Sequence, residues 1–186
     1  MTSGVSSMDR LDLQRLTERM TISPFVIATT AAAVSSAAVG GLFYAFSTFV
    51  MAGLTRAEPA QAIAAMRGIN AEAQASAPFL VLFAGSALLA LGVAVAALFK
   101  LSQPGTGYVL TGAALGLAAF VVTMAFNVPL NDRLDAVDPS GLPAADALRE
   151  WRAYLGPWTW WNHVRTAAPL LGSVLMLVGL RYRSLP

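Results

Sequence analysis

The stretch PFLVLFAGSALLALGVAVAALF, residues 78–99, decides the fold class because it contains no charged residue. A helix needs about 20 mostly apolar residues to cross the hydrocarbon core of a bilayer. Three further stretches meet this condition, over about residues 24–51, 107–128 and 163–180. The sequence therefore predicts an all-α membrane protein, a four-transmembrane-helix bundle with short amphipathic surface helices.

The composition agrees with this prediction. Hydrophobic residues make up 56% of the 186 residues and charged residues 12%, and the mean hydropathy is +0.63. Soluble domains carry roughly a quarter charged residues, and a net charge of +2 is too small to indicate a nucleic-acid surface. The absence of cysteine excludes disulfides, thiolate nucleophiles and zinc-thiolate sites, and a single histidine excludes a bis-histidine haem within one chain. We therefore expect no metal site, no cofactor and no nucleic-acid partner.

The sequence also predicts how the chain is divided. Residues 1–22 form an amphipathic N-terminal segment, and residues 23–186 form a single membrane domain. Ser23 followed by Pro24 is a suitable N-cap and first-turn pair for the first span. Lys and Arg are slightly more numerous on the side that holds both termini, which favours cytoplasmic termini.

Three features between and within the spans carry further expectations. Pro129 lacks an N–H and clashes with the preceding turn, so the third span should kink or end there. The stretch AADALREWRAYL, residues 144–155, has a helical pattern and precedes the fourth span. Small residues four apart, such as Gly112 and Gly116, let helix backbones approach closely and permit a homo-oligomer.

Polar residues gather at one membrane face. If the four spans are antiparallel, one membrane face holds the ends of the first and third spans and the starts of the second and fourth spans. The polar residues at the end of the third span and the start of the fourth are Asn127, Asn131, Asp132, Arg133, Asn162, His163 and Arg165. Asn162 and Arg165 are three apart and share a helix face, whereas His163 and Arg165 diverge on an ideal helix. Those two can face one cavity only if the helix starts irregularly or the cavity wraps around its end.

Each of these residues also has a structural interpretation. Trp158 and Trp160 are typical of an interfacial aromatic belt. Arg165 could extend to the lipid headgroups, and Asp132 with Arg133 could form a solvated helix end. A polar residue inside a span more often indicates function, and the Asn–His–Arg combination is more specific than any one member.

Four motifs together resemble the anthrone oxygenase family. They are GLFYAFSTFVMAGL (41–54), IN (69–70), NVPLNDRL (127–134) and WNHVRT (161–166), in that order, and the resemblance extends over about residues 24–180. Ala52 departs from the proline that we expect the family to have after FVM. The resemblance implies a multi-pass protein of the bacterial cell membrane.

The resemblance further implies a cofactor-independent monooxygenase that oxidises an anthrone-like polyphenol with dioxygen. On this interpretation the base is His163 or Asp132, with Asp132 otherwise orienting His163, and Arg165 stabilises the oxyanion. The expected substrate-binding residues are Asn127, Asn131, Asn162 and Arg133 by polar contacts, and Trp161, Phe46, Phe49 and Tyr44 by ring contacts, although Tyr44 and the phenylalanines also fit simple packing.

A different class of function stays open. The Asn–His–Arg cluster could tie helix ends together in a non-catalytic structural or ligand-binding membrane protein. That alternative predicts that His163→Ala lowers stability and that no small molecule is oxidised. A small transporter is less consistent, because the spans carry no charge near their centres.

Overall fold

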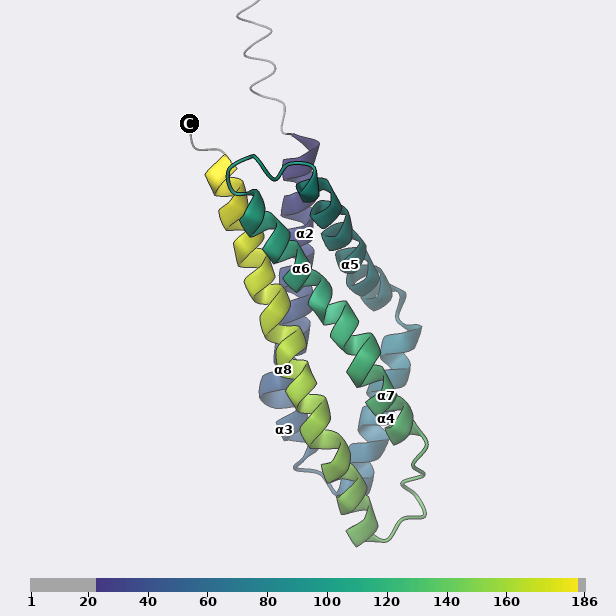
Figure 1. Ribbon diagram of the computed structural model, residues 1–186. Helices are drawn as coiled ribbons and strands as arrows, with labels where there is room; N and C mark the ends of the chain where they lie inside the picture. The colour runs from purple at the N-terminus through teal and green to yellow at the C-terminus, as the bar shows by residue number, and fades with distance from the viewer. Residues whose placement is uncertain (1–22, 184–186) are drawn as a thin grey trace, which may run out of the picture.

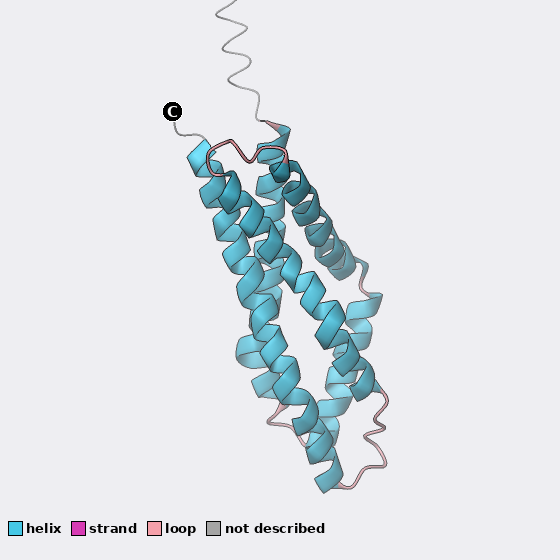
Figure 2. Cartoon of the chain, in the orientation of Figure 1, coloured by secondary structure: helices cyan, strands magenta, loops and turns pink. Residues whose placement is uncertain are grey.

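The computed structural model describes residues 23–183, and the predicted amphipathic segment over residues 1–22 lies outside them (Figure 1). Every regular element of this described part is a helix (Figure 2). In chain order the elements are α2 (Pro24–Ala45), η1 (Phe46–Val50), α3 (Met51–Leu54), α4 (Pro59–Ala75), α5 (Ala77–Leu98), α6 (Thr106–Val122), η2 (Thr123–Asn127), α7 (Val128–Asp135) and α8 (Ala144–Arg183). The elements η1 and η2 are single π-helical segments.

Four helical segments of the described chain are long and apolar enough to cross a membrane. They are Pro24–Leu54, Ala77–Leu98, Thr106–Asp135 and Ala144–Arg183. Large apolar side chains such as Val81 and Leu88 point outward from the bundle, as expected of a surface in contact with lipid. The protein is therefore an all-α, multi-pass membrane protein, as the hydropathy predicts.

The third span does not end at Pro129. It continues from α6 through the π-helical turn η2 into α7, and Pro129 stands in the first turn of α7. The missing N–H of a proline is tolerated best in a first turn, and the widened turn before it changes the hydrogen-bond register that Pro129 would otherwise interrupt. The helix can therefore pass the proline.

The fourth span is also longer than its apolar core. Residues 144–155 and 163–180 belong to one helix of 40 residues, α8, which contains Pro157 and Pro169. Ser23 and Pro24 do begin α2, although the Ser23 side chain makes no capping hydrogen bond.

Glycines let α6 pack closely against α8 in the half of the bundle near the connection between α5 and α6. A Cβ added to Gly112 would lie 2.6 Å from the carbonyl oxygen of Gly172, and a Cβ on Gly172 would lie 2.5 Å from the carbonyl oxygen of Gly112. A Cβ on Gly116 would lie 2.9 Å from Ser36 Oγ of α2. Gly41, by contrast, faces open space. The spacing of Gly112 and Gly116 therefore serves close packing within this chain.

A second core joins α3, α4 and α7 to the first half of α8. Its buried members are Met51, Ala62, Ile63, Met66, Leu134, Ala147, Trp151, Tyr154 and Trp158. Figure 1 shows these elements together at the end of the molecule opposite to the C-terminus. This core supports the wall of the cavity described next.

Candidate functional site

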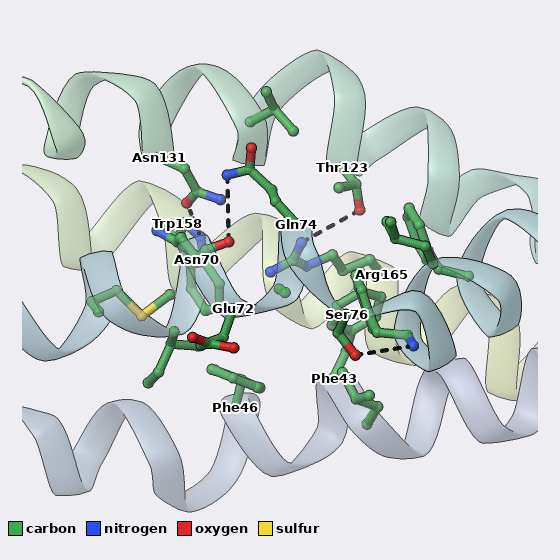
Figure 3. A pocket seen from close by; sticks show the side chains of 18 of the residues that line it. Phe43, Phe46, Asn70, Glu72, Gln74, Ser76, Thr123, Asn131, Trp158 and Arg165 are labelled. Carbon is green, nitrogen blue, oxygen red and sulfur yellow. Dashed lines mark hydrogen bonds between the residues drawn. The ribbon is translucent and has the colours of Figure 1, made fainter.

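A cavity of about 630 Å³ lies where α2, α4, α5, η2, α7 and α8 meet (Figure 3). Aromatic and aliphatic side chains form most of its wall: Leu42, Phe43, Phe46, Met66, Ile69, Phe79, Leu80, Phe83, Met124, Val128 and Trp158. Its polar lining consists of Asn70, Glu72, Gln74, Ser76, Thr123, Asn131, Asp132 and Arg165. The volume is within the roughly 300–1,000 Å³ that small-molecule sites occupy.

Arg165 places a guanidinium in this cavity wall while its side chain is only 4% exposed. Its Nε donates to Asn162 Oδ1 at 2.9 Å, and Nη1 donates to Thr123 Oγ1 at 3.4 Å. The guanidinium carbon lies 4.2 Å from the ring centroid of Phe43 and 4.6 Å from that of Trp158. Two aromatic faces and two side-chain oxygens therefore hold the cation.

No carboxylate neutralises Arg165 within residues 23–183. Ion pairs such as Arg67–Asp135 and Arg149–Asp146 involve other residues. An unpaired charge inside a membrane-spanning bundle costs several kcal/mol, on the order of 3 in insertion measurements. The cavity therefore favours a ligand that brings an anionic or electron-rich oxygen to Arg165.

Asn162 positions Arg165 rather than lining the cavity. Its Nδ2 donates to the Phe43 carbonyl oxygen at 2.8 Å and to Ser47 Oγ at 2.7 Å, and its Oδ1 accepts from Arg165. Both N–H groups and the carbonyl of this fully buried amide are thus used within the protein. Asn162 ties α8 to α2.

The two asparagines at the end of the third span lie differently. Asn131 lines the cavity, and its Oδ1 accepts from Tyr154 Oη and from Trp158 Nε1, both at 2.9 Å. Asn127 is fully buried outside the cavity lining. Its Nδ2 donates to the Trp158 carbonyl oxygen at 3.3 Å, while its Oδ1 is buried without a partner in the described residues.

His163 does not meet Arg165 in this cavity. It is exposed and lines a second, more open groove of about 600 Å³, together with Thr55, Thr159 and Trp160. Because α8 is a continuous α-helix through this region, side chains two residues apart point roughly 200° away from each other. The irregular helix start that would bring both into one cavity is absent from α8.

Four other predicted residues also lie outside the cavity wall. Tyr44 and Phe49 are 55% and 64% exposed and point away from the bundle. Trp161 stacks on Phe126, with ring centroids 3.7 Å apart. Arg133 is exposed and lines a small separate hollow. Of the predicted site residues, the cavity brings together Phe46, Asn131, Asp132 and Arg165.

Sequence reasoning missed several residues around Arg165. Trp158, expected in an interfacial belt, is instead buried against Arg165 and lines the cavity. Phe43 and Thr123 contact Arg165, and Glu72 lines the cavity. Phe43 lies within GLFYAFSTFVMAGL and Glu72 lies two residues after Asn70, so both motifs carried a signal, whereas nothing marks Thr123. Within residues 23–183 no three His, Asp or Glu side chains are close enough to hold a metal ion.

A family model described as anthrone oxygenase matches residues 74–175, which is more than half of the chain. The matched range contains η2, α7 and the part of α8 that carries Trp158 and Arg165. Neither the curated proteins nor the solved structures include a match to this chain.

Proposed function

This chain belongs to the anthrone oxygenase family, and we propose that it oxidises an anthrone-like polyphenol with dioxygen in the cavity beside Arg165. The observation that carries the proposal is a buried guanidinium without a carboxylate partner, set in a cavity whose wall is mainly aromatic and aliphatic. A deprotonated anthrone is a flat, delocalised anion. Its oxygen suits the guanidinium, and its rings suit side chains such as Phe43 and Phe46.

The proposed reaction balances without a further oxidant. A base removes one methylene proton, and the resulting anion passes one electron to dioxygen. The two radicals combine, and the peroxide anion takes the proton back from the base. Removal of the second methylene proton then breaks the O–O bond and forms the new carbonyl, and hydroxide leaves as water. One anthrone and one dioxygen thus give one anthraquinone and one water.

Arg165 contributes electrostatic stabilisation in this scheme. The negative charge of the anthrone anion rests largely on its oxygen, and a preorganised cation in a site of low polarity stabilises that charge more than water does. The hydrogen bond to Asn162 and the faces of Phe43 and Trp158 hold the guanidinium before the substrate arrives. Little reorganisation is then needed when the charge develops.

Asp132 is our candidate base because it lines the same cavity as Arg165. It is also exposed, so it can exchange its proton with water. His163 stays the competing candidate, and would act only on a substrate bound in the groove that His163 lines. Asp132→Asn and His163→Gln separate the two assignments, because only one should lower the rate of anthrone oxidation by about 100-fold.

The cavity reaches the lipid-facing surface of the bundle. Leu80 and Met124 both line it, are 42% and 53% exposed, and belong to membrane-spanning segments. Glu72 and Asp132 line it and are also exposed. We infer that an apolar substrate enters from the bilayer between Leu80 and Met124, while protons exchange at the carboxylates.

One observation favours a second, non-catalytic function. The Asn162 hydrogen bonds to Phe43 and Ser47 join α8 to α2, as expected if the polar cluster mainly holds helices together. Under this alternative Arg165 binds an anionic ligand or completes the packing, and no oxygen is consumed.

Dioxygen uptake tests the proposal. The full chain in nanodiscs is given an anthrone, and the spontaneous oxidation rate measured with empty nanodiscs is subtracted. Arg165→Gln should lower the catalysed rate by about 100-fold or more, and Arg165→Lys should retain part of it because the charge remains. Arg152→Gln removes an exposed cation from the same helix and should leave the rate unchanged.

Thermal unfolding of each variant must accompany the rates, so that a lost fold is not mistaken for lost catalysis. Equal rates for the wild type and for empty nanodiscs would overturn the proposed oxidation. A lower unfolding temperature in Arg165→Gln, without catalysis in the wild type, would favour the structural alternative.

A further inference from the structure

Trp158 decides which atom of the Asn131 amide faces it. The indole Nε1–H can donate a hydrogen bond but cannot accept one, and it lies 2.9 Å from Asn131. The amide atom at this position must therefore be the oxygen, Oδ1. The Tyr154 hydroxyl also donates to that oxygen at 2.9 Å. Two donors thus converge on the oxygen of the amide. If the amide group rotated by 180°, its Nδ2 would face the indole N–H of Trp158, which cannot accept a hydrogen bond.

The amide nitrogen of Asn131 is left for another partner. Its two N–H groups take part in none of the hydrogen bonds found between described residues, and Asn131 lies in the wall between the cavity and an adjoining hollow beside Arg67 and Asp135. In Figure 3 Asn131 lies next to Trp158, with the guanidinium of Arg165 further along the same cavity. Asn131 therefore offers the cavity its two amide N–H donors, whereas its acceptor Oδ1 is already used by Trp158 and Tyr154.

The same indole also orients Arg165. Its edge donates to Asn131, whereas its face lies 4.6 Å from the guanidinium carbon of Arg165. Trp158 itself is 2% exposed and packs against Phe46 and Tyr154, so it cannot move easily. A rigid ring thus separates two donor groups of the cavity, one neutral and one cationic.

We propose that Asn131 is a second donor that selects the ligand of this cavity. The site takes a flat molecule with two separated acceptor oxygens, one bound by Arg165 and one by the Asn131 amide nitrogen. A ring system of the same size without such oxygens binds more weakly, because both donors would lose water without gaining a partner. This inference rests on the proposed function, since it concerns the substrate class of the same cavity.

The variant Asn131→Asp tests this inference with little change in shape. Its carboxylate can still accept from Trp158 and Tyr154, but the atom that faces the cavity changes from a donor to an acceptor. Binding of anthraquinone, which has two opposed carbonyl oxygens, is compared with binding of anthracene, which has none. The full chain is kept in detergent and the measurement is anaerobic, so that no turnover interferes.

The wild type should bind anthraquinone more tightly than anthracene. Asn131→Asp should weaken anthraquinone binding by about tenfold or more, the loss of one buried hydrogen bond, and should leave anthracene binding within about twofold. Gln61→Glu makes the same chemical change at an exposed position of α4 and should alter neither. An equal effect on both ligands, or no effect on either, would overturn the role of Asn131.

A second variant tests the part assigned to Trp158. Trp158→Phe keeps an aromatic face for Arg165 but removes the Nε1–H, so the Asn131 amide can rotate and present either side. The preference for anthraquinone over anthracene should fall severalfold while binding of both persists. An unchanged preference would show that the indole does not set the amide orientation. This measurement also covers the case in which Asn131→Asp fails to fold.

The two proposals fail in different ways. Anthraquinone selectivity that depends on Asn131, without catalysed oxygen uptake, would leave the donor site in place and remove the oxidation. Catalysed oxygen uptake by the wild type, with unchanged anthraquinone binding in Asn131→Asp, would support the oxidation and overturn the role of Asn131. A wild type that binds neither ligand would overturn the inference directly.

Discussion

The two halves of the bundle are packed in opposite ways. In the half near the α5–α6 hairpin the buried core is mostly small, with Ala32, Ala33, Ala97 and Ala113 around a few larger residues. In the other half it contains Trp151, Tyr154, Trp158, Met51 and Met66. Small residues let backbones touch and leave no room for a ligand. Large rings and polar groups keep the helices apart, and the cavity lies at that end.

The largest effect should come from a substitution in the close-packed half. Gly112→Leu places a side chain against the backbone of α8, where even a Cβ would lie 2.6 Å from Gly172 O. We expect a loss of about 3 kcal/mol in the free energy of unfolding, since backbone cannot move as a side chain can. Chemical unfolding in detergent measures it.

Gly92→Leu is the matched control, because nothing lies within 4 Å of a Cβ at Gly92. Its unfolding free energy should stay near that of the wild type. Similar losses for both variants would contradict the close-packed description of the α6–α8 contact.

A smaller loss of stability is expected at the boundary between the halves. Asn162→Leu keeps the volume but removes the hydrogen bonds to Phe43 O, Ser47 and Arg165. Buried groups left without partners cost about 1–3 kcal/mol, so we expect roughly 2 kcal/mol. Unfolding measured in the same detergent gives the value, and an unchanged unfolding temperature would argue against the tie between α2 and α8.

The opening of the cavity to lipid is tested by a kinetic effect. Met124→Trp adds bulk between α5 and η2, and should slow the association of lipid-dissolved anthraquinone by about tenfold, while stability changes little. Val121→Trp is the control, because Val121 is 58% exposed on α6 and does not line the cavity. Equal association rates in Met124→Trp and Val121→Trp would move the entrance elsewhere.

The smallest effect concerns the loop between α7 and α8. The hydroxyl and the backbone N–H of Ser140 donate to Asp138 Oδ1 at 2.6 and 3.0 Å, and these bonds lower the pKa of Asp138 below its ordinary value of 3.8. The resulting stability is present above pH 4 and is lost as the pH falls through the lower pKa of the folded state.

Ser140→Ala removes the hydroxyl bond and should lower the unfolding temperature slightly at pH 7. The difference from the wild type should shrink as the pH is lowered from 4 towards 2. A difference that grows in acid would contradict the assignment to ionised Asp138.

The sequence predicted those site residues whose place in the site depends only on their position along a span. Asn131, Asp132, Phe46 and Arg165 lie at predicted span ends and do meet in one cavity. His163 lies elsewhere because side-chain direction turns by about 100° per residue, and α8 is regular where an irregular start would have been needed. The motif GLFYAFSTFVMAGL indicated the region of Phe43, but it could not separate Phe43 from Phe46 and Phe49, because only helix phase and packing decide which of these rings meets Arg165.

The sequence by itself determined the membrane class, the four spans and the face that carries the polar residues. The free energy of removing apolar residues from water depends on how much apolar surface is removed and not on a particular partner. Hydropathy along the sequence is therefore enough to predict the spans. Only the tertiary structure decided that Asn162 accepts from Arg165, that Trp158 donates to Asn131 and that His163 faces a separate groove. Hydrogen bonds and charge contacts are directional and short, so they depend on helix phase and packing distance, which span positions do not specify.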